Sequence, residues 1–163
     1  MSEPILRPRS ASLRLVALRL ALPDLAAVAR QPDVIDALRI TVQYHDGRQP
    51  DQVATLVRER HSAGPRLTVA YRRANDRPLV LTLSIEAERM EAFSTGLRQL
   101  NFDHLDDQPD IPWFGEDLWL VERAAGTFHH DVIIAPESAT GPHAGIVDLT
   151  RALLHEAVRT IHV

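Results

Sequence analysis

The sequence predicts an α+β fold: a mostly antiparallel sheet of about five to six strands, with two main helices packed mainly on one face. Three observations support this fold class. Short segments in which apolar and polar residues alternate predict strands. Turn-forming residues separate neighbouring strands, which is typical of hairpins. Two longer segments carry apolar residues at helical spacing and predict helices.

The first third of the chain holds one clear strand and two ambiguous segments. In residues 37–46, Ile40 and Val42 alternate with polar neighbours, so we expect a strand. Segment 53–60 fits a strand or a short helix, and its valine and threonine residues favour a strand. The apolar residues of segment 12–22 fit both the spacing of a helix and that of a strand, and the sequence leaves its structure open.

A strand–turn–strand–helix order occurs twice in the rest of the chain. The predicted strands are 66–73, 79–83, 118–123 and 128–135. Ser84 is a candidate N-cap for the first helix, whose apolar residues recur from Met90 to Leu100. The second helix is expected to begin near Pro142 and to carry an apolar stripe as far as Ile161. The repeated order raises the hypothesis of a ββα pseudo-repeat.

The length of 163 residues suits a single α+β domain spanning 1–163. We divide this domain into four consecutive parts. They are a helical or irregular N-terminal segment (1–36), strands followed by a helix (37–100), an acidic loop with proline and tryptophan (101–116), and a hairpin with a C-terminal helix (117–163).

The composition excludes several kinds of chemistry. The chain has no cysteine, which excludes disulfides, thiolate nucleophiles, zinc ribbons and iron–sulfur clusters. It also has no lysine, so Schiff-base catalysis and a P-loop lysine are excluded. The lack of cysteine suits a reducing compartment, and we expect a soluble, cytoplasmic protein. The apolar stretch 13–22 is interrupted by arginine and is too short to span a membrane.

His129 and Asp131 are the candidate metal ligands. Residues two apart on a strand point to the same face, so both side chains are expected on one side of the predicted strand 128–135. A histidine and a carboxylate form part of the ligand set of non-haem iron sites, which needs a third ligand from elsewhere. The histidines at 143, 155 and 162 are candidates for that ligand.

The acidic loop is the candidate site for binding a partner. It is longer than most connections between secondary-structure elements, and long loops often carry function. The spacing of its acids does not match an EF-hand. The candidate residues are Asp103, Asp106, Asp107, Asp110, Trp113 and Phe114.

Three functional hypotheses follow. The sequence contains no nucleophile elbow and no glycine-rich phosphate loop, so it favours a non-catalytic protein-interaction or regulatory domain that uses the acidic loop or an exposed sheet edge. The alternative is a metal-dependent enzyme using His129 and Asp131. A second alternative is a weak nucleic-acid binder that uses the arginine-rich N-terminal half.

The expected partners follow from the first hypothesis. We expect another protein or a second copy of the chain, no membrane, and no nucleic acid, because the net charge is −4. No cofactor is predicted, and a divalent metal enters only with the enzyme alternative.

Overall fold

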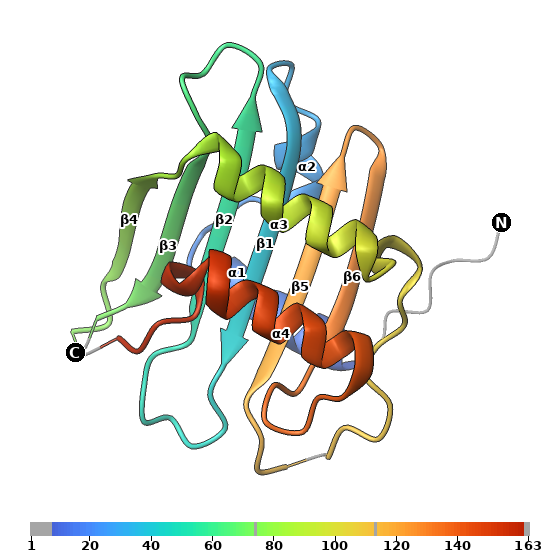
Figure 1. Ribbon diagram of the computed structural model, residues 1–163. Helices are drawn as coiled ribbons and strands as arrows, with labels where there is room; N and C mark the ends of the chain where they lie inside the picture. The colour runs from blue at the N-terminus through green and yellow to red at the C-terminus, as the bar shows by residue number, and fades with distance from the viewer. Residues whose placement is uncertain (1–7, 74, 113, 162–163) are drawn as a thin grey trace, which may run out of the picture.

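The computed structural model describes residues 8–73, 75–112 and 114–161, and it confirms the α+β fold class. Six strands form one antiparallel sheet in the order β4-β3-β2-β1-β5-β6 (Figure 1). The strands are β1 (Val34–Gln43), β2 (Gln52–Glu59), β3 (Arg66–Arg72), β4 (Pro78–Ser84), β5 (Leu118–Ala125) and β6 (Phe128–Ile134). The main helices are α1 (Pro8–Arg19), α3 (Ala87–Gln99) and α4 (Gly141–Leu153), and α2 (Leu25–Ala29) is a single short turn.

Helices α3 and α4 lie side by side across one face of the sheet, as predicted (Figure 1). The main core lies beneath them, where Phe93 and Leu97 of α3 and Ile146 of α4 are fully buried. The two helices approach closely because each has a glycine at the contact. A Cβ at Gly96 would lie 2.6 Å from Leu149, and a Cβ at Gly145 would lie 2.8 Å from Leu100.

The opposite face of the sheet is covered by α1 and α2 (Figure 1). Segment 12–22, which the sequence left open, falls mostly in α1. Its apolar residues Leu13, Val16, Ala17 and Leu20 have the i, i+3, i+4, i+7 spacing of a helix, and all four are buried against the sheet. A helix on each face explains why β1 is buried along almost its whole length.

The ambiguous segment 53–60 is a strand, as its composition favoured, and forms most of β2. Two other predictions were wrong in detail. Ser84 does not cap α3, because it pairs with Arg66 in the sheet and the helix begins at Ala87. The C-terminal helix ends at Leu153 and is followed by a short 3₁₀ turn at His155–Ala157.

The element order β3-β4-α3 is repeated by β5-β6-α4, and the pseudo-repeat itself stays a prediction. Of the helices in the described ranges, none is long and apolar enough to cross a lipid bilayer.

Candidate functional site

The acidic loop covers one edge of the sheet. On the outer side of β6, the backbone N–H of Ile133 donates to Asp107 Oδ1 at 2.8 Å, and Gln108 N–H donates to the Ile133 carbonyl at 3.0 Å. The N–H of Ala135 donates to Gln108 Oε1 at 3.0 Å. Buried or edge backbone groups need such partners, so Asp107 and Gln108 act as a substitute for a seventh strand.

The other candidate residues of the loop do not converge on one site. Asp103 forms a two-point ion pair with Arg123, at 2.8 and 2.6 Å, and this guanidinium lowers the pKa of Asp103. Asp106 has an exposed carboxylate, while its carbonyl accepts a hydrogen bond from His143 Nε2 at 2.8 Å. Asp110 lies exposed in a turn. Phe114 is 91% exposed, and Trp113 lies outside the described residues.

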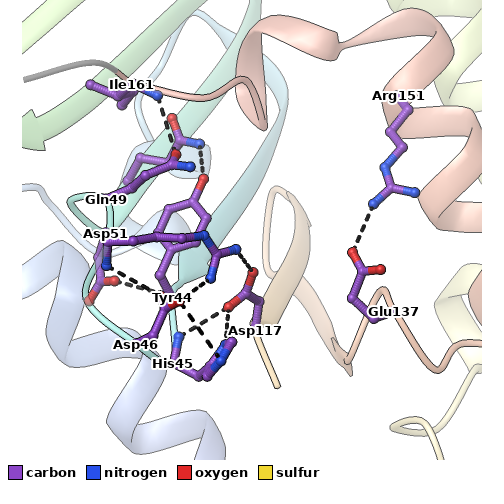
Figure 2. Close-up of polar contacts among 11 residues, drawn as sticks. Tyr44, His45, Asp46, Gln49, Asp51, Asp117, Glu137, Arg151 and Ile161 are labelled. Carbon is purple, nitrogen blue, oxygen red and sulfur yellow. Dashed lines mark hydrogen bonds and ion pairs between the residues drawn. The ribbon is translucent and has the colours of Figure 1, made fainter. Parts of the chain in front are cut away.

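Asp117, which lies between the acidic loop and β5, bonds to the connection between β1 and β2 (Figure 2). Its Oδ1 accepts hydrogen bonds from the backbone N–H and the ring Nδ1 of His45, at 3.1 and 2.7 Å, and its Oδ2 accepts one from Arg48 at 2.8 Å. Burial opposes the charge of Asp117, but these bonds outweigh it and lower the pKa of the carboxyl. Asp117 therefore holds the chain just after the acidic loop to the connection between β1 and β2.

His129 and Asp131 lie on the α1 face of β6, together with Glu122 of β5. His129 Nε2 lies 3.0 Å from Glu122 Oε1, and one donor atom from each of the three side chains lies within 4.8 Å of the others. Glu122 is directly opposite Asp131 in the β5–β6 pairing. The arrangement resembles a ligand set of one histidine and two carboxylates, which suits a divalent metal.

A guanidinium already supplies positive charge to this cluster. Arg14 on α1 forms a short ion pair with Asp131 through Nη2, and its Nη1 lies 3.5 Å from Glu122 Oε1. Ser10 Oγ also donates to Asp131, at 3.3 Å. A metal ion bound by the three ligands would therefore compete with Arg14 for both carboxylates.

The histidines proposed as third ligands lie elsewhere. His143 is buried on α4 and bonds to the carbonyl of Asp106. His155 lies 3.6 Å from Glu156, and His162 is outside the described part of the chain. The third ligand that the structure offers is Glu122. The signal for Glu122 in the sequence was its position as a charged residue directly after the apolar run Leu118–Val121 of a predicted strand.

A cleft of about 380 Å³ lies at one end of α3. Charged side chains line much of it, but they pair with each other. Arg58 bonds to both carboxylate oxygens of Asp36 at 2.9 Å, and Arg123 holds Asp103. A charged ligand entering this cleft would have to break these pairs, so the cleft has little free charge to offer.

The second edge of the sheet is β4, and no segment in the described ranges pairs with its outer side. Ile85 N–H donates to the Pro65 carbonyl, and Arg73 N–H donates to the Arg77 carbonyl, so odd-numbered residues of this segment bond to β3. The N–H and C=O groups of the even-numbered residues therefore point outward, because the direction alternates along an antiparallel strand. The outward residues are Pro78, Val80, Thr82 and Ser84.

The side chains of β4 are uncharged throughout the seven residues Pro78–Ser84. Its register with β3 is continuous from Arg66↔Ser84 to Arg72↔Pro78, without a bulge. Val80 is 49% exposed, and Leu79 and Leu81 are only half-buried. Proteins usually protect such an edge with charges, bulges or a covering segment. Pro78 lacks an N–H, but the rest of the outward backbone is able to pair with another strand.

Comparisons with known proteins do not indicate a function for the chain. No protein-family model matches the chain, and no curated protein matches it at a significant level.

Proposed function

We propose that the chain is a non-catalytic protein-interaction domain that binds by pairing an extended strand of its partner with β4. One observation carries this proposal: β4 is an uncharged edge strand without a bulge, with outward backbone groups at Val80, Thr82 and Ser84. An added strand supplies hydrogen bonds to these groups, and its side chains extend the apolar surface of the sheet.

The contrast between the two edges supports this choice of surface. Asp107 and Gln108 cover the outer side of β6, whereas among the described residues no segment pairs with the outer side of β4. The acidic loop supports the proposal less well as a binding surface, because Asp107 already bonds to β6 and Asp117, just after the loop, bonds to the connection between β1 and β2.

A matched pair of variants at Thr82 tests strand addition. Thr82→Pro removes an outward N–H without removing a bond to β3, whereas Thr82→Val keeps the N–H and the strand propensity. The probe is a peptide of alternating valine and threonine with arginine at both ends, titrated into ¹⁵N-labelled protein. We expect shifts confined to 78–84 in the wild type and in Thr82→Val, and none in Thr82→Pro. Shifts centred on another surface, or none with the wild type at a concentration where sedimentation shows a monomer, would reject the proposal.

Metal binding at Glu122, His129 and Asp131 is a second candidate function, favoured by the 4.8 Å grouping of their donor atoms. This candidate keeps the enzyme alternative open for testing, with Glu122 added to the two residues that the sequence indicated. It requires Arg14 to leave both carboxylates before the metal binds.

Nucleic-acid binding has less support. Several arginines of the N-terminal half are ion-paired within the fold, including Arg58 with Asp36 and Arg72 with Asp76. Paired guanidinium groups have less to gain from a phosphate. We also propose the cytoplasm as the compartment of action, because a chain without cysteine gains nothing from oxidising conditions.

A further inference from the structure

We propose that the strand added to β4 is β4 of a second copy of this chain, related by a two-fold axis at Leu81. This inference rests on the proposed function and names the partner. Two copies would then form one continuous antiparallel sheet across the axis.

The outward backbone groups are matched in this register. With the axis at Leu81, Val80 lies opposite Thr82 of the second copy, Leu79 opposite Leu83, and Pro78 opposite Ser84. All seven residues of the two strands therefore overlap. Val80 N–H faces the carbonyl of Thr82 of the second copy, Thr82 N–H faces that of Val80, and Ser84 N–H faces that of Pro78. The one outward residue without an N–H, Pro78, lies at the end of the overlap.

The side chains are also self-complementary about this axis. On the α3 and α4 face, Leu81 meets Leu81 of the second copy, and Leu79 meets its Leu83. On the α1 face, Val80 meets Thr82, and both are β-branched residues that favour strands. The leucines are half-buried in one chain, so pairing removes more of their apolar surface from water.

The charge around the strand permits this pairing. No charged side chain lies within Pro78–Ser84, so self-association brings no like charges face to face inside the strand. The nearest acids beyond its two ends are Asp76 and Glu86, and each lies within 3.5 Å of an arginine of its own chain, Arg72 and Arg89. An interface of one strand pair is small, so we expect a reversible dimer with a dissociation constant on the order of 10 µM.

Sedimentation velocity on the full chain, from dilute to several hundred micromolar, tests this dimer. Two double variants at exposed positions provide the comparison. Val80→Glu/Thr82→Glu places like charges opposite each other and is expected to stay monomeric. Val80→Arg/Thr82→Glu places opposite charges across the axis and is expected to restore the dimer in a salt-sensitive way. Circular dichroism checks that both variants keep the fold.

The outcomes separate the two proposals. A wild-type dimer that dissociates in the all-glutamate variant and reforms in the arginine–glutamate variant supports the two-fold pairing. A wild type that stays monomeric at all concentrations, while the valine–threonine peptide still binds β4, rejects the second copy and keeps strand addition. A dimer that is equally strong in the all-glutamate variant rejects the β4 interface. Failure of both dimer and peptide rejects both proposals.

Discussion

Arg39 on β1 and Glu122 on β5 lie directly opposite each other in the sheet, and only 3% of each residue is exposed. Arg39 also donates to Thr55 Oγ1 at 3.0 Å and to the Pro23 carbonyl at 2.8 Å. Burial lowers the pKa of Arg39, and the charges of Glu122 and Asp24 act in the opposite direction. The pair belongs to a polar row that crosses all six strands on the α1 face. The row runs through Asp131, Glu122, Arg39, Thr55, Thr68 and Thr82.

Removing one member of this buried pair is expected to be costly. Arg39→Met leaves Glu122 with less compensation in a dry environment, and we expect a loss of about 3 kcal/mol in the free energy of unfolding. Arg39→Met/Glu122→Leu should lose clearly less than the sum of the two single variants. Urea unfolding of the four proteins measures this coupling. Additive losses would show that the two charges do not compensate each other.

Asp107 is expected to stabilise the covered edge, whereas its neighbour Asp106 is not. Asp107→Ala leaves the Ile133 N–H without its acceptor, and we expect a loss of about 1–3 kcal/mol and faster amide exchange at Ile133. Asp106→Ala is the matched control, because its carboxylate is exposed, and it should stay within about 0.5 kcal/mol of the wild type. Equal effects of the two substitutions would contradict the edge-covering role.

The Asp103–Arg123 pair predicts part of the acid sensitivity of the fold. Because the guanidinium lowers the pKa of Asp103 below its usual 3.8, the folded state gains stability above that pH and loses it as the pH falls through the lowered value. Asp103→Asn lacks this gain. The stability difference between wild type and Asp103→Asn should therefore be largest near neutral pH and shrink below about pH 4. Urea unfolding as a function of pH measures it, and a constant difference would contradict the prediction.

Arg14→Ala tests whether the guanidinium stands in for a metal ion. Without it, the carboxylates of Glu122 and Asp131 lose the guanidinium that a metal would have to displace, and we expect Zn²⁺ to bind and to raise the melting temperature. Arg14→Ala/His129→Ala, which lacks the only nitrogen ligand of the three, should show a much smaller rise. No rise in Arg14→Ala would reject the metal site. An equal rise in the wild type would show that metal displaces Arg14 and would favour the enzyme alternative.

Local patterns in the sequence were sufficient for most of the strands and for the fold class. Alternation of apolar and polar residues located β1 and β3, whose alternate apolar side chains lie in the main core under α3 and α4. The pattern at 12–22 was ambiguous because α1 is short and has Arg14 among its apolar residues. The stripe that suggested a long C-terminal helix continues past Leu153 because the following 3₁₀ turn also buries Ala157.

The candidate sites depended on long-range pairing that the sequence does not reveal. His129 and Asp131 were placed on one face by strand periodicity alone, but Glu122 and Arg14 reach them through the β5–β6 register and the packing of α1. Similarly, the uncharged strand 79–83 was recognised as a strand. Its position at an open edge follows from the order of six strands, of which only the hairpin neighbours can be predicted locally.

Amide hydrogen exchange at the two edges of the sheet distinguishes an open β4 from a covered one. In dilute solution, we expect fast exchange at Val80, Thr82 and Ser84 and slow exchange at Ile133 and Ala135, whose N–H groups are covered by Asp107 and Gln108. Saturation with the valine–threonine peptide should then slow the three β4 amides. Slow exchange at β4 in the dilute chain, or unchanged fast exchange with the peptide bound, would contradict the claim that β4 is an open edge that binds a strand.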